Sequence, residues 1–158
     1  MLWRDLDDAD GALAACDEAI AAEPDSPLGY VEKADILWQA LSHPEQTIAV
    51  ATEGLEAAGE NYGLHILRGY ALSELGRHEE ALEDMNAAVK LTPLGGISYY
   101  HRATVLYELG RYEEAWRDVH TAESGLSQIG WTPSQGFIDK LSEAMPEPER
   151  DADDGAGG

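Results

Sequence analysis

Small and apolar residues recur along most of the chain at intervals of three and four positions, and a Gly or Pro interrupts each run. This spacing places them on one face of an α-helix, so each run predicts an amphipathic helix. One run ends at Gly76, a residue able to adopt the left-handed conformation that closes a helix, and the next ends before Pro93. The apolar positions are Leu64, Leu67, Ala71, Leu72 and Leu75 in the first run and Ala81, Leu82, Met85, Ala88 and Val89 in the second. Two helices joined by a short turn are therefore predicted on either side of Gly76.

The helix pair recurs along the chain. Segments 67–93 and 101–122 share the pattern E-L-G-R-x-E-E-A-x-x-D, which sets Gly76 34 residues before Gly110. One unit earlier, Gly69 corresponds to Ala34 at a spacing of 35, and we expect the extra residue in Ser42-His43-Pro44, where two helices must be joined. Residues 11–27 resemble the segment that ends at Pro93, and each matching residue lies 69 positions earlier in the chain. A repeat architecture follows from this periodicity.

These residues and their period resemble the tetratricopeptide repeat, a helix-turn-helix unit that stacks into a right-handed superhelix. The resemblance covers roughly residues 1–127 and is most specific in the third and fourth units. It implies an all-α solenoid of antiparallel helix pairs, with about three and a half repeats and a C-terminal capping helix. Ser127 and Gly59 stand where the family usually has Pro, and Thr47 replaces its usual Ala.

The register divides the chain into predicted segments. The first unit is partial, because counting back one repeat from Pro27 places the start of its first helix before Met1. Trp3, Leu6 and Leu13 are then expected to be partly exposed at an open end. The segments are a partial first repeat (1–26), three full repeats (27–61, 62–95 and 96–129), a capping helix (130–145) and a disordered tail rich in acid and Gly (146–158).

The capping helix is predicted from one more amphipathic segment. Thr132-Pro133 is expected to open a helix that runs to about Ala144. Phe137, Ile138 and Leu141 form its apolar side, and Trp131 is expected to pack beneath it.

Composition narrows the classes of partner. The 158 residues include 10 Lys and Arg against 31 Asp and Glu, a net charge of −21, which disfavours nucleic acid. A basic partner and adaptation to high salt both explain this acidity. No apolar run approaches the roughly 20 residues of a membrane span, and no basic and apolar leader opens the chain, so a cytoplasmic protein without membrane contact is expected. The single cysteine, Cys16, leaves no internal disulfide.

Catalytic and metal-binding motifs are missing from the sequence. No two of the histidines, His43, His65, His78, His101 and His120, have the spacing of three or four that aims two imidazoles at one metal. His65 takes the repeat position of Tyr30 and Tyr99, which favours a packing role. Cys16 lies at an apolar helix position and is interpreted as a small buried residue. We expect no cofactor, no metal and no enzymatic activity.

Basic residues occupy one position of each repeat. Lys33, Arg68 and Arg102 are equivalent, and Asp84 and Asp118 follow the two arginines by 16 residues each. In an antiparallel helix pair these sites can face one another. They are interpreted as salt bridges of the scaffold, with an anion site as the alternative.

The resemblance also implies where a partner binds, because in this family the first helices of successive repeats line a concave groove. Aromatic and acidic side chains in such a groove suit a protein or peptide segment with apolar and basic residues. A known branch of the family grips the carboxyl terminus of chaperones with Lys, Arg and Asn, but the comparable positions here, Glu32, Gly63 and Leu67 among them, lack that positive set. The predicted groove residues are Val31, Asp35, Trp38, Ile66, Tyr70, Ser73, Glu74, Tyr100, His101, Thr104, Tyr107 and Glu108.

Two other functions remain open. The chain could be a structural or self-associating part of a longer array, forming a homodimer through the N-terminal edge at Trp3, Leu6 and Leu13. It could also be an enzyme with an unrecognised site. The leading hypothesis is a non-enzymatic adaptor that binds a peptide or partner protein.

Overall fold

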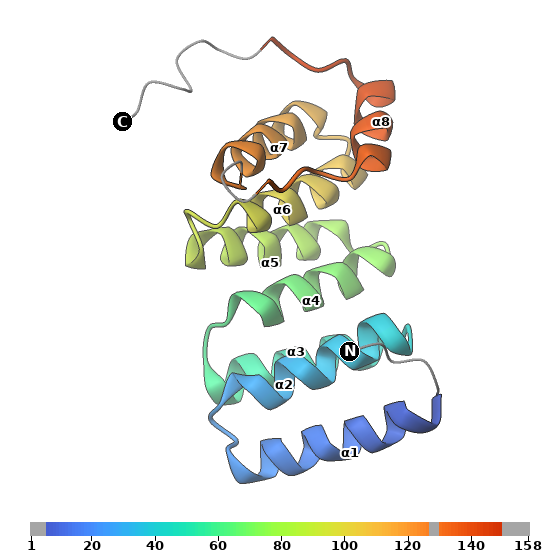
Figure 1. The fold of residues 1–158 in the computed structure, drawn as a ribbon, viewed down its shortest axis with the longest axis vertical. Helices are drawn as coiled ribbons and strands as arrows, with labels where there is room; N and C mark the ends of the chain where they lie inside the picture. Colours follow the sequence, from blue (N-terminus) through green and yellow to red (C-terminus); the bar gives the residue numbers. More distant parts are fainter. Residues whose placement is uncertain (1–5, 127–129, 150–158) are drawn as a thin grey trace. The chain divides into compact units, whose positions relative to one another are not determined.

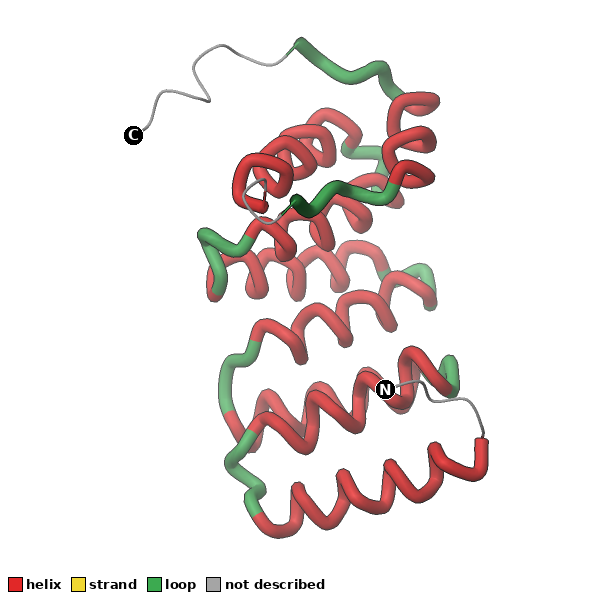
Figure 2. Tube along the Cα trace, viewed as in Figure 1, coloured by secondary structure: helices red, strands yellow, loops and turns green. Residues whose placement is uncertain are grey.

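The computed structural model describes residues 6–126 and 130–149. Within these ranges the chain forms α-helices and one π-helical turn, with no strand (Figure 1, Figure 2). The predicted all-α fold of antiparallel helix pairs is confirmed. The elements are α1 (Leu6–Ala22), α2 (Pro27–Asp35), the π-helical turn η1 (Ile36–Ala40), α3 (Pro44–Ala58), α4 (Tyr62–Glu74), α5 (His78–Leu91), α6 (Gly96–Glu108), α7 (Tyr112–Leu126) and α8 (Gln135–Ala144).

The helices form two compact units that divide between Leu94 and Gly95. In the first unit, α1 to α5 follow one another back and forth, and α2 also packs beside α4 (Figure 1). In the second unit, α6 and α7 form an antiparallel pair and α8 packs against α7. None of the helices in the described ranges is long and apolar enough to cross a membrane.

The ends of the chain differ in how far the structure describes them. Trp3 and residues 150–158 lie outside the described residues, as does the side chain of Leu6. Leu13 is half-buried against a core cluster of the first unit formed mainly by α2, α3 and α4. The segment after α8 contacts the second unit at Glu147, whose Oε1 lies 2.9 Å from Nε2 of His120.

Each helix pair turns back through a residue with positive φ. Gly76 and Gly110 adopt φ of 75° and 71°, as predicted for Gly76 from its place after an apolar run. Ser42, 34 positions before Gly76, adopts φ of 52° in the second repeat. A positive φ therefore occurs at this turn position in three repeats, although Ser carries a Cβ that disfavours it.

The extra residue of the second repeat lies in the helix and not in the turn, which corrects the expectation that Ser42-His43-Pro44 holds it. The backbone N–H of His43 donates to the carbonyl of Leu37, whereas the equivalent N–H in the third repeat, that of Arg77, donates to Leu72. The first of these bonds spans one residue more. The π-helical turn Ile36–Ala40 absorbs that residue, because a π-turn lengthens each hydrogen-bonded ring by one position.

Small residues occupy the crossing of the two helices in each pair. A Cβ built on Gly69 of α4 would lie 2.7 Å from Cε of Met85 and 3.4 Å from the carbonyl oxygen of Ala81, both on α5. At the same repeat position α6 has Ala103, fully buried, and the residue equivalent to Met85 is Val119. The longer Met side chain therefore fills the space that the missing Cβ of Gly69 leaves.

Replacing Ser42 with Gly is expected to stabilise the protein by about 1 kcal/mol, because Gly adopts positive φ without the steric cost of a Cβ. Gly76→Ser is the matched control and should destabilise by a similar amount. A Cβ at Gly76 would meet no atom within 4 Å, so only the backbone conformation changes. Equilibrium unfolding in denaturant measures both. A loss of stability in Ser42→Gly would contradict the argument.

Gly69→Ala is expected to give opposite results in two backgrounds. In the natural chain the new methyl displaces Met85, and overpacking of this kind costs about 1–3 kcal/mol. In a Met85→Val background, which reproduces the pair of the fourth repeat, the better helix propensity of Ala should stabilise by up to about 1 kcal/mol. A double-mutant cycle measures the coupling. Additive changes would show that the two side chains do not compete for space.

Candidate functional site

A pair of stacked aromatic rings marks one surface of the first unit. The rings of Trp38 on η1 and Tyr70 on α4 lie 6.1 Å apart between centroids, with 6° between their planes. Both side chains are half-buried. We call this pair, together with the groove residues predicted on the same stretches of chain, the Trp38–Tyr70 face; the predicted members are Val31, Asp35, Ser73 and Glu74.

Packing and local hydrogen bonds position the polar members of the Trp38–Tyr70 face. Asp35 is half-buried and accepts a hydrogen bond from the side chain of Gln39, one turn further along. The Ser73 hydroxyl lies 2.9 Å from Nδ1 of His78 at the start of α5, whereas Glu74 is exposed. Ile66, also predicted for the groove, is only 8% exposed and offers little surface to a partner.

In the second unit, other parts of the chain cover the aromatic residues of α6. Trp131 lies edge-on against Tyr100 with 5.1 Å between ring centroids. Phe137 of α8 lies edge-on against both Tyr100 and Tyr107, at 5.6 and 5.9 Å. The sequence assigns Trp131 and Phe137 to the cap, but it does not predict their contact with groove residues, because nothing in the repeat pattern relates the cap to α6.

The other predicted groove residues of α6 have distinct environments. His101 is half-buried, and burial lowers its pKa to about 4, so its imidazole is neutral at physiological pH. The hydroxyl of Thr104 donates to the carbonyl of His101 at 2.7 Å. Glu108 is exposed at the end of the helix. These three residues and the Trp38–Tyr70 face lie in different units.

The predicted scaffold salt bridges are confirmed in both repeats. Nε and Nη2 of Arg68 donate to Oδ2 and Oδ1 of Asp84 at 2.8 and 2.7 Å, and Arg102 grips Asp118 in the same two-point manner at 2.7 and 2.8 Å. Both carboxylates are buried, and each holds its arginine at two points, which favours a scaffold role over an anion site. Lys33, at the equivalent position, pairs instead with Asp17 of α1.

His65 extends one of these pairs into a partly buried network that the repeat pattern does not predict. Its Nδ1 lies 2.8 Å from Oδ1 of Asp84 and its Nε2 lies 2.7 Å from Oε2 of Glu60. Nη1 of Arg68 also donates to the hydroxyl of Thr52 on α3. The only signal in the sequence is a His at a position that holds Tyr in the neighbouring repeats.

The histidine distinguishes the two buried aspartates. Its hydrogen bond to Asp84 raises the pKa of His65 although burial opposes the charge. Burial alone would raise the pKa of Asp84, but hydrogen bonds from Arg68 and His65 hold it below its ordinary value. At Asp118 burial raises the pKa despite the Arg102 pair. Two aspartates at one repeat position thus have opposite shifts.

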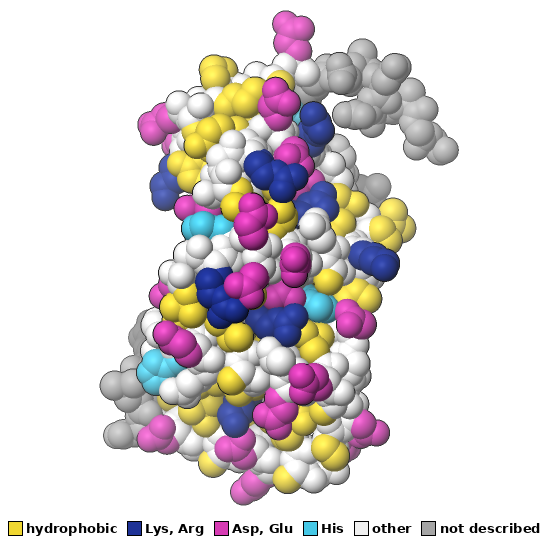
Figure 3. Space-filling model, turned by 180° about the vertical axis from the view of Figure 1, so that it is seen from behind, with side chains coloured by type: hydrophobic (Ala, Val, Ile, Leu, Met, Phe, Trp, Pro, Cys, Tyr) yellow, Lys and Arg dark blue, Asp and Glu magenta, His cyan; other side chains and the backbone are white. Residues whose placement is uncertain are grey.

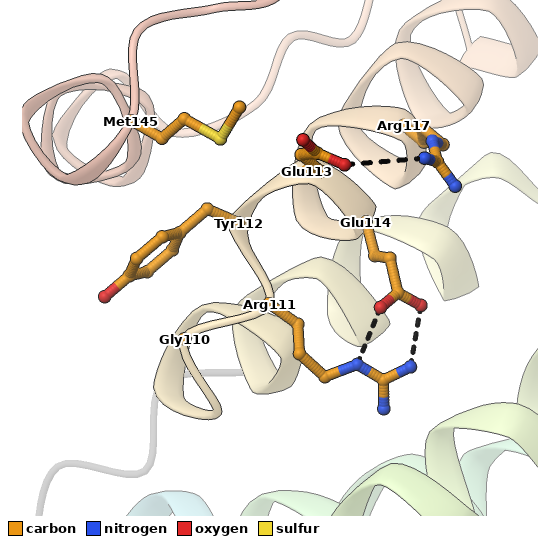
Figure 4. Close-up of a pocket in the computed structure, with 7 residues that line it drawn as sticks. All are labelled: Gly110, Arg111, Tyr112, Glu113, Glu114, Arg117 and Met145. Carbon is orange, nitrogen blue, oxygen red and sulfur yellow. Dashed lines mark hydrogen bonds and ion pairs between the residues drawn. The ribbon is translucent and has the colours of Figure 1, made fainter.

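A hollow lies in the second unit, where α6 turns into α7. Its volume is about 360 Å³, and Figure 4 shows Arg111, Glu113, Glu114 and Arg117 around it, with Met145 on the opposite side. Arg111 and Arg117 pair with Glu114 and Glu113, so its cations already have carboxylate partners. In the described part of the chain no cluster of His, Cys, Asp or Glu could hold a metal ion. Cys16 is buried and burial raises the pKa of its thiol, which does not suit a nucleophile.

Most basic side chains are engaged within the molecule. The chain has 10 Lys and Arg, and six of them form ion pairs in the described residues. On the face seen in Figure 3, Lys and Arg lie beside Asp and Glu and do not gather in one basic patch. The 31 Asp and Glu outnumber these basic residues, so the protein presents a net negative charge to a partner.

Comparison with known families assigns the fold. A family model described as tetratricopeptide repeat matches residues 66–119, which run from within α4 to within α7 and include the turns at Gly76 and Gly110. Residues 66–119 therefore carry tetratricopeptide repeats (TPRs). A comparison with curated proteins finds no match.

Several solved structures share this fold. TTC0263, a thermophilic TPR protein of Thermus thermophilus, is 19% identical with a TM-score of 0.68, over 89% of this chain and 74% of that one. A crystal structure of MamA is 16% identical with a TM-score of 0.66, over 92% and 94% of the two chains. The first TPR of Spaghetti (RPAP3), bound to the HSP90 peptide SRMEEVD, is 24% identical with a TM-score of 0.66, over 75% and 92%.

The buried network predicts a pH dependence of stability. Because the folded-state pKa of His65 is raised, its protonated form stabilises the fold fully below its ordinary pKa of 6.5, and this stabilisation is lost as pH rises through the raised value. His65→Tyr installs the residue found in the neighbouring repeats. Between about pH 6 and about pH 9 the free energy of unfolding should fall more in the natural protein than in His65→Tyr. Parallel curves from denaturant unfolding at each pH would contradict this.

Proposed function

We propose that this TPR protein is a non-enzymatic binding module that takes a segment of a partner protein on the Trp38–Tyr70 face. The observation that carries the proposal is the stacked pair itself. Two large rings held parallel and half-buried supply contact area that costs little conformational entropy on binding. Tyr and Trp are also the residue types that most often dominate the energy of protein interfaces.

The charge around the pair indicates the chemistry of the partner. Asp35 ends α2 directly before η1, Glu74 lies one helical turn after Tyr70 on α4, and the net charge is −21. A Lys or Arg of the partner can pair with these carboxylates or lie over an aromatic face. The proposed ligand is therefore an extended or helical segment with apolar side chains and at least one Lys or Arg.

The comparisons support a peptide ligand, whereas the charges of this chain indicate a different peptide sequence. The first TPR of Spaghetti is bound to a peptide that contains two consecutive glutamates and ends in aspartate. In this chain the comparable groove positions include Asp35, Glu32 and Leu67, with no positive set to hold such acids. Like charges would repel an acidic tail, so we expect a basic segment instead.

An array of short peptides that vary in aromatic, Lys and Arg content tests the proposal. Peptides retained by the natural protein should lose about 2 kcal/mol of binding free energy in Tyr70→Ala, the usual loss at a hot spot. Tyr70→Phe keeps the ring and should retain most of the affinity. Binding of the same peptides by Tyr70→Ala with undiminished affinity would exclude this face.

Charge reversal separates selective contacts from general attraction. Glu74→Lys should change which peptides bind, because it removes a carboxylate beside the rings. Glu83→Lys makes the same change of net charge at an exposed position of α5, the outer helix of the pair, and serves as the control. If both variants lose basic peptides equally, the attraction comes from net charge and not from the Trp38–Tyr70 face.

A further inference from the structure

The segment from Trp131 to Leu141 packs against α6 and α7. Phe137 meets two tyrosine rings of α6 edge-on, and Trp131 meets one of them. One turn after Phe137, Leu141 is fully buried. These contacts use the anchor spacing of i and i+4 by which an amphipathic helix binds in the groove of another protein.

The attachment of α8 is confined to its inner side. At its end, Nε1 of the buried Trp116 donates to the carbonyl of Met145 at 3.0 Å. Its outer residues Asp139, Lys140 and Glu143 are exposed. A helix of ten residues is too short to be stable alone in water, so α8 depends on being docked.

We propose that the α6–α7 surface is a helix-docking site of which α8 is the built-in occupant, and that its external partner is a basic amphipathic helix with an aromatic residue and a Leu four positions later. The aromatic residue takes the place of Phe137 between Tyr100 and Tyr107, and the Leu takes the place of Leu141. Lys or Arg replaces Asp139 and Glu143 on the outer side, where a protein of charge −21 attracts positive charge.

This proposal is independent of ligand binding at the Trp38–Tyr70 face, which lies in the other unit. The two surfaces also differ in availability. An external helix on α6 must compete with α8, so its apparent affinity is reduced by the fraction of molecules in which α8 is undocked. Removing the internal competitor should reveal the site.

The experiment uses the full chain and a fluorescent synthetic peptide of residues 131–145. In Phe137→Asp the chain's own α8 loses its aromatic anchor, and the peptide should bind by fluorescence anisotropy at least about tenfold more tightly than to the natural protein. A peptide that itself carries Phe137→Asp is the matched control and should not bind. A peptide with Lys in place of Asp139 and Glu143 should bind more tightly than the natural one.

Further variants locate the site. Tyr100→Ala added to Phe137→Asp should abolish binding, whereas Tyr70→Ala added to it should leave binding unchanged. Equal peptide affinity for Phe137→Asp and the natural protein would overturn the proposal, as would loss of binding caused by Tyr70→Ala. Loss of peptide binding through Tyr70→Ala would contradict the helix-docking proposal but not the Trp38–Tyr70 proposal. The failures of the two proposals can therefore be distinguished.

Hydrogen exchange on the natural protein keeps the proposal falsifiable if Phe137→Asp does not fold. An exchangeable occupant must undock while α6 and α7 stay folded. The amides of α8 should therefore exchange at least about tenfold faster than the most protected amides of α6 and α7. Exchange of all three helices at one common rate would mean that α8 is an inseparable part of the core, and the proposal would be wrong.

Discussion

Two helix backbones approach closely only where one of them presents Gly or Ala, and each helix pair of this protein depends on such a crossing. In the third repeat a Gly (Gly69) packs against a long Met (Met85), whereas in the fourth an Ala (Ala103) packs against a shorter Val (Val119). The buried ion pairs depend on it too, because Arg68 and Asp84 each directly precede a crossing residue. The close approach of the two helices brings the guanidinium of Arg68 to the buried carboxylate of Asp84, which it meets with two parallel hydrogen bonds.

Repetition explains how much of the fold could be predicted from the sequence. The crossing, the Gly turns and the 16-residue spacing of Arg102 and Asp118 recur, so each unit provides evidence for the next. The π-helical turn Ile36–Ala40 could not be placed, because an extra residue is visible in the spacing but its location depends on backbone hydrogen bonds. The contact between Phe137 and α6 could not be predicted either, because the capping helix has no counterpart in another repeat.

The candidate surfaces were only partly predictable for a related reason. Scaffold positions are alike from repeat to repeat, whereas the positions that face a partner vary: Trp38 corresponds to Ser73 in the next repeat and to Tyr107 in the one after. The register could mark these positions, but it could not show that Trp38 stacks on Tyr70, a residue of a different column. His65 shows the same limit, because its partner Glu60 lies outside the repeated pattern.

The last pair of any repeat array has an apolar side that no further repeat covers, and this constraint links stability to recognition in the second unit. Here α8 covers that side with the fully buried Leu141 and the half-buried Phe137, and full burial of a side chain such as Leu141 is worth about 1.5–3 kcal/mol. An external helix that binds α6 displaces these side chains, so its own contacts must first compensate for the lost burial free energy. The tyrosines can therefore be both a structural contact and a selective one, because only a helix that repeats the anchors of α8 and adds favourable charge can displace it.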